Sequence, residues 1–196
     1  MKVSIISFLL SMVVISGTET PNYKKIKKFK DFELRNYESI IIATTTVERD
    51  FSESNSIGFR RLANYIFGDN DKNIKIEMTA PVITSFNSLY ENQKDISFIM
   101  PKKHNLNSLP LSNKNNVSIK VKEVGLVAVI GFGGWATEER TNKYINKLKI
   151  LIQNEKLNIS DEIIVAQYNS PWAIPPFRKN EILIPLDKKN NQGLFK

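Results

Sequence analysis

The stretch Lys-Ile-Glu-Met-Thr-Ala-Pro-Val-Ile-Thr-Ser-Phe, residues 75–86, is the most informative part of this sequence for the fold. Apolar Ile74, Ile76 and Met78 alternate with polar residues, the period-2 pattern of a strand with one buried and one wet face. Pro81 has no N–H to give to a ladder, so it belongs on an edge strand or at a bulge. We therefore expect a bent strand here, as the closing of a small barrel would require.

An amphipathic helix is expected directly before this stretch. Ser52–Ser56 offers several helix N-caps, and Gly68 is a suitable stop. Between them, apolar residues fall at positions i, i+3, i+4 and i+7 and form one stripe: Phe59, Leu62, Ala63 and Ile66. The pattern predicts a helix that packs outside the barrel through this stripe.

The other expected elements repeat one order. Strand composition recurs at 32–37, 40–47, 96–100, 117–124, 126–132, 163–168 and 181–186. Thr137 caps a second helix with its own apolar stripe: Tyr144, Leu148, Leu151 and Ile152. The order strand, strand, helix, strand, strand thus occurs twice, and neither half makes a closed sheet alone. We predict a single α+β domain, a distorted eight-stranded β-barrel with two packed helices, built from two ββαββ halves.

Residues 1–17 have the pattern of a signal peptide. Lys2 supplies a positive n-region, and Val3–Ile15 is an apolar run broken by serines. The run is shorter than the roughly 20 residues that span a bilayer, and small residues follow it at positions 16 and 17. We expect secretion with this segment removed; the alternative is an uncleaved anchor. Two N-glycosylation triplets, at Asn116 and Asn158, agree with secretion.

The remaining chain divides into three parts. Residues 18–30 form a basic lead-in, with five lysines interleaved with aromatic and apolar residues. This lead-in either contacts a polyanion or an anionic membrane, or is a solvated segment whose aromatic side chains pack on the domain edge. Residues 31–187 form the folded domain, and residues 188–196 form a polar C-terminal tail.

Composition limits the possible chemistry. The formal net charge of +8 over 196 residues favours an acidic partner: an anionic membrane surface, a polyanion or a carboxylate-bearing ligand. The absence of cysteine excludes disulfides, zinc–thiolate sites, iron–sulfur clusters and thiol nucleophiles. The single histidine, His104, leaves little for a histidine-based metal site, and we expect no metal-ligating residues.

The catalytic inventory is equally poor. A Ser-His-Asp triad would have to use His104, which lies in a polar loop with no glycine-flanked serine to meet it. The Gly-Phe-Gly-Gly-Trp run at 131–135 lacks the lysine and the glycine spacing of nucleotide-binding loops, and is typical of a turn. We therefore expect a binding protein rather than an enzyme.

Five segments, in order along the chain, resemble the SOUL family of haem-binding proteins. They begin at Phe32-Glu-Leu-Arg, Gly58-Phe-Arg-Arg, Lys75-Ile-Glu-Met, Tyr168-Asn-Ser-Pro and Arg178-Lys-Asn-Glu. The motif most specific to the family is Lys-Ile-x-Met-Thr-x-Pro-Val, at residues 75–82. The resemblance implies the distorted barrel with two helices. It also implies binding of haem or a related tetrapyrrole, with a role in haem handling more than in catalysis.

The resemblance places the groove beside the first helix and the loop between the last two strands. Haem is a flat apolar disc with two carboxylates on one edge, so a binder offers an apolar groove with cations at its rim. The implied apolar contacts are Phe59, Leu62, Ala63, Ile66, Met78, Trp172 and Phe177, and the implied basic contacts are Arg60, Arg61, Arg178 and Lys179. The alternatives are that the helix residues belong to the core and that the basic residues are solvated surface.

Iron ligation separates this sequence from a strong haem protein. His104 lies in a loop away from the implied groove, and a strand methionine such as Met78 is usually core. We therefore expect non-covalent haem binding with weak or no axial ligation, in a secreted carrier or scavenger with no nucleic-acid partner and no stable membrane anchor. The alternative function is a secreted SOUL-fold protein-interaction domain that has lost haem binding.

Overall fold

The computed structural model describes residues 18–88, 90–169, 173–174 and 177–187. The expected signal peptide (1–17), the C-terminal tail (188–196) and Trp172 lie outside the described residues. The described residues form two helices and nine strands: β1 Tyr23–Lys28, β2 Glu33–Tyr37, β3 Ile40–Glu48, α1 Phe51–Ile66, β4 Val82–Phe86, β5 Gln93–Ile99, β6 Ser118–Lys122, β7 Gly125–Gly133, α2 Glu138–Asn154, β8 Ile163–Gln167 and β9 Lys179–Pro185.

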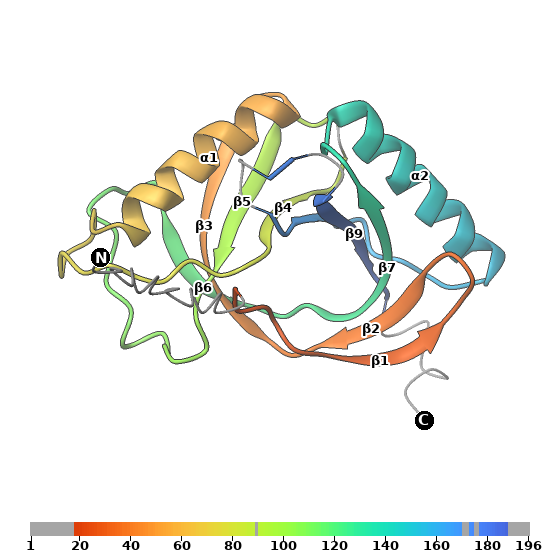
Figure 1. Ribbon diagram of the computed structural model, residues 1–196, viewed down its shortest axis with the longest axis horizontal. Coiled ribbons are helices and arrows are strands. Elements are labelled where there is room, and N and C mark those ends of the chain that lie inside the picture. Colours follow the sequence, from red (N-terminus) through yellow and green to blue (C-terminus); the bar gives the residue numbers. More distant parts are fainter. Residues whose placement is uncertain (1–17, 89, 170–172, 175–176, 188–196) are drawn as a thin grey trace, which may run out of the picture.

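The strands form one antiparallel sheet that curls into a half-barrel, with both helices on its outside (Figure 1). The strand order is β1-β2-β7-β9-β8-β4-β5-β3-β6. Apart from β1, exchanging β2–β5 with β6–β9 reverses this order and leaves it otherwise unchanged. The two predicted ββαββ halves are therefore related by a pseudo-two-fold axis that passes between β4 and β8. The predicted α+β barrel fold is confirmed.

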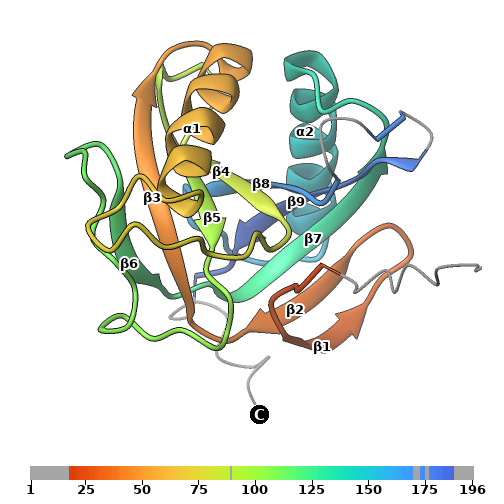
Figure 2. The same ribbon diagram turned by 60° about the vertical axis from the view of Figure 1, so that its left-hand side comes forward.

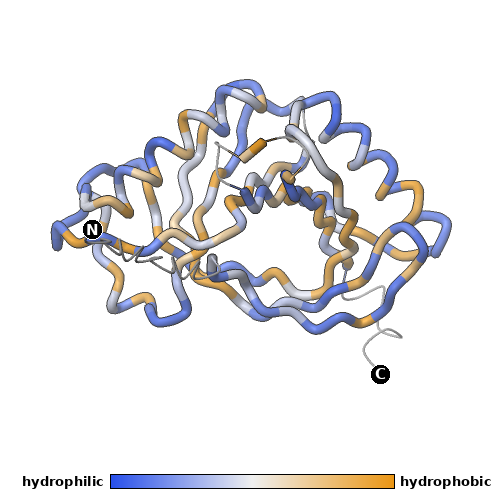
Figure 3. Tube along the Cα trace, in the orientation of Figure 1, coloured by the Kyte–Doolittle hydropathy of each residue, from blue (hydrophilic) through white to orange (hydrophobic). Residues whose placement is uncertain are grey.

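Three apolar clusters hold the layers together. Alternate residues of β7 point to opposite faces of the sheet: Leu126, Ala128 and Ile130 contact α2, whereas Val127 and Val129 line the inside of the curl. A second cluster holds α1 against β3 and β5. Figure 3 shows the hydrophobic residues concentrated along the strands and the hydrophilic ones along the helices and loops. Figure 2 shows the two helices side by side on one side of the sheet.

Only the second part of the stretch 74–86 forms a strand. The ladder begins at Val82, after Pro81, and the expectation of strand pairing over residues 74–79 is wrong. The backbone of this segment bonds to other partners: the Ile76 N–H donates to the Ile66 carbonyl (2.8 Å) and the Ala80 N–H donates to the Glu19 carbonyl (2.9 Å). Ile76 is buried, but Met78 is 41% exposed rather than core.

Two further differences concern the elements near the N-terminus. Helix α1 begins earlier than expected, because the Asp50 side chain accepts from the Glu53 N–H (2.8 Å) and caps the helix, whereas Ser52–Ser56 lies inside it. The basic lead-in contains β1, which pairs with β2 at the edge of the sheet through a bulge between Lys25 and Lys27. The sheet therefore has one strand more than predicted. Thr137 caps α2 as expected.

Candidate functional site

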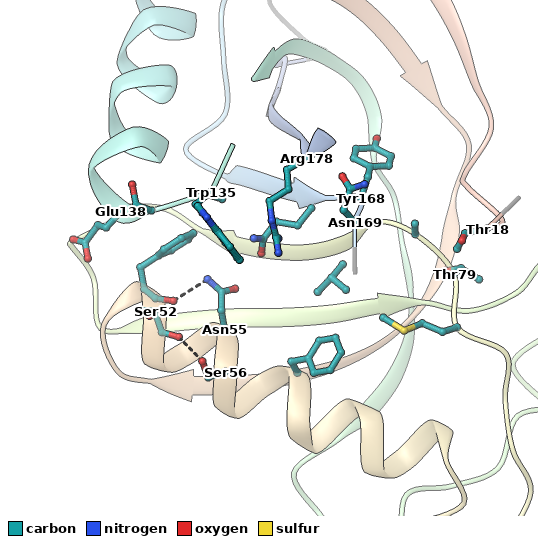
Figure 4. Close-up of a pocket in the computed structure, with 18 residues that line it drawn as sticks. Thr18, Ser52, Asn55, Ser56, Thr79, Trp135, Glu138, Tyr168, Asn169 and Arg178 are labelled. Atoms are coloured by element: carbon teal, nitrogen blue, oxygen red, sulfur yellow. Dashed lines mark hydrogen bonds between the residues drawn. The ribbon is translucent and has the colours of Figure 1, made fainter. Parts of the chain in front are cut away.

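A cleft of about 730 Å³ lies between the N-terminal halves of the two helices. We call it the interhelix cleft. The pseudo-two-fold axis explains its place: the helices occupy equivalent positions in the two halves, and the start of β4 and the end of β8 lie between them. Its walls are thus built by segments far apart in the sequence (Figure 4).

The wall formed by α1 presents two aromatic rings and a row of small polar side chains. Phe51 and Phe59 frame Ser52, Asn55 and Ser56 along this wall. The Asn55 side chain is held in place, since its amide donates to the Phe51 carbonyl (2.8 Å) and its oxygen accepts from the Thr84 hydroxyl (2.5 Å). The Ser56 hydroxyl donates to the Ser52 carbonyl (3.1 Å). This wall is a fixed amphipathic surface.

The opposite wall comes from the turn before α2 and from the start of β9. Trp135 is half exposed, and the Arg178 guanidinium lies 3.6 Å from the centre of its ring, in a cation–π contact. Arg178 is 9% exposed, and its Nε donates to the Ala173 carbonyl (2.8 Å). Glu138, in the first turn of α2, adds a carboxylate at this end of the cleft. The Arg178 guanidinium is therefore held in a fixed orientation in this wall, between the Trp135 ring and the Ala173 carbonyl.

The remaining lining residues come from two other parts of the chain. Met78, Thr79 and Ala80 lie before β4, and β8 and the residues after it contribute polar groups: Gln167, Tyr168 and Asn169. Figure 4 shows Thr18 and Thr79 together at the end opposite Glu138. Glu138 places a charged side chain at one end of the cleft, whereas Thr18 and Thr79 at the other end have neutral side chains.

Tyr168 connects the cleft to a buried ionic network inside the barrel. Its hydroxyl donates to Glu181 (2.6 Å), which also accepts two bonds from Arg35 (2.9 and 3.1 Å). Burial alone would raise the pKa of Glu181, but the bonds from Arg35 and Tyr168 outweigh it and hold that pKa below its usual value. Burial and the neighbouring Glu181 charge raise the pKa of Tyr168. The phenol therefore stays protonated at neutral pH.

Three of the residues expected at the site line the interhelix cleft: Phe59, Met78 and Arg178. Phe59 also contributes to the core, where its ring packs edge-on against the ring of Phe98, with 5.2 Å between the two ring centroids. Met78 presents its thioether at the cleft end, and Arg178 is the basic candidate that faces the cleft.

The other described candidates lie elsewhere. Leu62 and Ile66 are buried in the core beneath α1, and Ala63 packs against the same cluster. Arg60 is exposed, and Arg61 donates to the Thr45 hydroxyl (3.2 Å) and the Thr46 carbonyl (3.0 Å) on β3. Two more candidates are exposed and do not line the cleft: Phe177, and Lys179, whose ammonium lies 3.3 Å from Glu181.

Several lining residues were not expected from the sequence: Phe51, Ser52, Asn55, Ser56, Trp135, Glu138 and Tyr168. One signal was present. The two halves repeat, so the N-terminal turns of both helices must occupy equivalent places, and Trp135 stands directly before one of them. His104 lies away from the cleft, half-buried beside a separate hollow of about 200 Å³.

The described lining residues include serines and a carboxylate but no histidine or lysine that could act as a base for a nucleophile. In the part of the chain that the structure describes, no three His, Cys, Asp or Glu side chains come together as a metal site would require. A flat apolar molecule with an anionic group fits these walls.

Comparison with known proteins identifies similar chains. The family model for the SOUL heme-binding protein matches residues 18–185. Human Heme-binding protein 2 is 27% identical over 177 residues, covering 85% of each chain. Heme-binding protein 1 of Xenopus laevis is 28% identical over 178 residues, covering 86% of this chain and 93% of the relative.

Solved structures agree on the fold. The EcmrR C-terminal domain superposes with a TM-score of 0.63 at 14% identity, covering 84% of this chain and 98% of that one. A protein from Listeria innocua described as a hydrolase gives a TM-score of 0.56 at 10% identity, covering 82% and 94%. At these identities the likeness concerns the fold alone.

Proposed function

This chain belongs to the SOUL heme-binding protein family, and from that premise we propose that it binds haem or a related tetrapyrrole in the interhelix cleft as a non-catalytic carrier or scavenger. The observation that carries the proposal is the cleft itself. Its volume of about 730 Å³ falls inside the range of about 300–1,000 Å³ typical of small-molecule sites.

The walls suit a flat apolar ring. Trp135 and Phe59 offer aromatic surface, and Val82, Ala80 and Ala136 offer small apolar surface between them. Aromatic faces stack on conjugated rings with centroid separations of about 4.5–7 Å. The Asn55 and Ser56 side chains on α1 are held by hydrogen bonds, and together with Ser52 they add polar groups to this wall.

Arg178 supports the binding of an anionic edge. A guanidinium forms charge-assisted hydrogen bonds to carboxylates, which are about twice as strong as neutral ones. Its stacking on Trp135 fixes its position in the wall, so that less side-chain freedom is lost when a ligand binds. We therefore assign Arg178 as a partner of a ligand carboxylate.

Iron would contribute little to the affinity. The described lining residues include two side chains that could approach a haem iron, the Met78 thioether and the Tyr168 phenol. The raised pKa of Tyr168 disfavours the phenolate, and its hydroxyl already donates to Glu181. Binding would then rest on ring packing and carboxylate pairing, and an iron-free porphyrin should bind comparably.

We also propose that the protein acts outside the cell. The support is the signal-peptide pattern of residues 1–17. No helix in the described part of the chain is long and apolar enough to cross a membrane. Expression of the full chain with a C-terminal tag in eukaryotic cells tests this. Tagged protein in the medium is expected, and complete retention in the cell would contradict secretion.

The experiment for the function is a haemin titration of residues 18–196, which contain every described helix and strand. Absorbance in the Soret region and quenching of tryptophan fluorescence report binding, because Trp135 lines the cleft. Saturable one-to-one binding, displaced by iron-free protoporphyrin, is expected. Binding no tighter than to an unrelated basic protein would contradict the proposal and favour the protein-interaction alternative, and steady turnover of the porphyrin would contradict a non-catalytic role.

A further inference from the structure

The first described residues form a strap that starts at one end of the interhelix cleft and continues along the separate hollow beside His104. In this N-terminal strap, residues 18–22, the Glu19 carbonyl accepts from the Ala80 N–H (2.9 Å) and the Glu19 carboxylate accepts from the Lys102 N–H (2.9 Å). The Asn22 side chain accepts from the Lys102 ammonium (2.8 Å). Both ends of the strap are therefore attached to the body of the domain.

Thr18 is the residue next to this anchor, and it lines the cleft. It is exposed, and it lies beside Thr79 at the end of the cleft (Figure 4). Glu19 is held by two hydrogen bonds, and Thr18 is the residue directly before it. The position of the Thr18 backbone is therefore restricted. Thr18 lines the cleft, so its backbone nitrogen lies near this end of the cleft.

That group depends on processing. While residues 1–17 are attached, the nitrogen belongs to a neutral amide. Cleavage after Gly17, which follows the apolar run and Ser16, would convert it to an α-amino group. Such a group has a pKa of about 7.7–8.0 in its ordinary state and is largely protonated at pH 7. Processing would thus place a new positive charge at the cleft.

The charges already in the cleft define where this new cation would act. Glu138 lies at the end near α2, Arg178 lies between, and Thr18 lies at the opposite end (Figure 4). An anionic group on a ligand is repelled at the Glu138 end and attracted toward Arg178 and Thr18. The layout orients a ligand that has one anionic edge and one apolar edge.

We propose that the α-amino group of Thr18, released by removal of residues 1–17, is a binding group of the cleft that pairs with a carboxylate of the ligand. The inference rests on the proposed tetrapyrrole binding and on the proposed processing. It adds a consequence to both: the precursor has a weaker site than the mature chain, and the carboxylate edge of the ligand points toward the strap.

The test compares two forms of residues 18–196 that differ only at the terminus, one with a free Thr18 amine and one with an acetylated amine. Each form is titrated with protoporphyrin, which carries two carboxylates, and with its dimethyl ester, which has the same ring without the charges. We expect acetylation to weaken protoporphyrin binding by about twofold to fivefold, as for a partly exposed charge pair, and to leave the ester unaffected.

A third form extended by two residues before Thr18 moves the charge by up to about 7 Å and should behave like the acetylated form. Equal protoporphyrin affinities for the free and acetylated forms would overturn the inference while leaving tetrapyrrole binding intact. Failure of all forms to bind either porphyrin would instead contradict the proposed function. Mass spectrometry of secreted protein should find Thr18 at the N-terminus; a start beyond Glu19 would also overturn the inference, because it removes the anchor.

Discussion

In the proposed haem site, Arg178 is the residue that we expect to contact a ligand carboxylate. It is 9% exposed and faces the cleft, whereas Arg60 on α1 is exposed outside it. We expect Arg178→Gln to weaken haemin binding by at least about tenfold, because a charge-assisted bond of about 1.5–3 kcal/mol is lost. Titration by Soret absorbance measures the change.

Arg60→Gln is the matched control, since it removes the same charge from the same protein without touching the cleft. Its haemin affinity should stay within about twofold of the parent, as for a screened surface charge. Equal weakening by the two substitutions would show that net charge attracts haemin, and would contradict the assignment of Arg178. Thermal unfolding of both variants checks that the fold is retained.

The Arg35–Glu181 pair makes stability depend on pH in a stated direction. The folded-state pKa of Glu181 is depressed, so the pair stabilises the fold above the unfolded-state pKa, and this contribution is lost as the pH falls through the folded pKa. Arg35→Met leaves a buried carboxylate without its partner and should cost about 3–5 kcal/mol at pH 7. Burial then raises the pKa of Glu181, so the loss should shrink toward pH 4.

Denaturant unfolding at pH 7 and pH 4 measures this difference. Adding Glu181→Gln to Arg35→Met removes the uncompensated charge and should recover part of the stability at pH 7. A loss that is the same at both pH values, or a double variant no more stable than Arg35→Met, would show that the network acts through packing rather than through charge.

The sequence identified the basic candidates but could not rank them. Helical periodicity gives the face of a helix on which a residue lies, and it places both Arg60 and Arg61 off the apolar stripe. Only the packed structure shows that Arg61 forms hydrogen bonds to β3. Arg178 was distinguished by its contact with Trp135, 43 residues away in the chain. Such a contact has no local sequence signal.

Helix α1 depends on a glycine at its contact with the sheet. A Cβ at Gly58 would lie 2.6 Å from the Cβ of Ile96, which is fully buried on β5. We expect Gly58→Ala to reduce the free energy of unfolding by a net amount of about 1–2 kcal/mol, because overpacking outweighs the gain of about 1 kcal/mol in helix propensity. Chemical denaturation measures it.

Asn64→Ala is the control on the same helix. Asn64 is exposed, so alanine there should be neutral or stabilising by up to about 0.7 kcal/mol through propensity alone. If Gly58→Ala were as stable as Asn64→Ala, the close approach of α1 to β5 would not be a constraint on the fold.

The stretch 74–86 shows how far local pattern reaches at the level of an element. Val82–Phe86 was predicted correctly, since β-type composition and pairing partners coincide there. Residues 74–79 alternate equally well, but their backbone groups bond to the end of α1 and to the N-terminal strap instead of to a ladder. Alternation marked Ile76 correctly as buried, but Ile74 and Met78 are 39% and 41% exposed. It also does not identify the hydrogen-bond partner of the backbone.

At the scale of the whole molecule, the repeated order of elements carried the fold prediction. Two ββαββ units imply a pseudo-two-fold arrangement, and the strand order β2-β7-β9-β8-β4-β5-β3-β6 has that symmetry. The interhelix cleft follows from the same axis. The family resemblance pointed to a groove beside α1, but to the apolar stripe of this helix, whose residues Leu62 and Ile66 hold the helix on the sheet and do not line the cleft.

The central claim, that the interhelix cleft is the tetrapyrrole site, is tested most directly by filling the cleft. Ser56 is exposed and lines it, so Ser56→Trp places an indole in the space proposed for the ring, whereas Asn64→Trp places the same side chain on α1 outside the cleft. In a haemin titration of both variants at equal thermal stability, we expect at least about a tenfold loss of affinity for Ser56→Trp and near-parental binding for Asn64→Trp. Parental affinity in Ser56→Trp would contradict the claim.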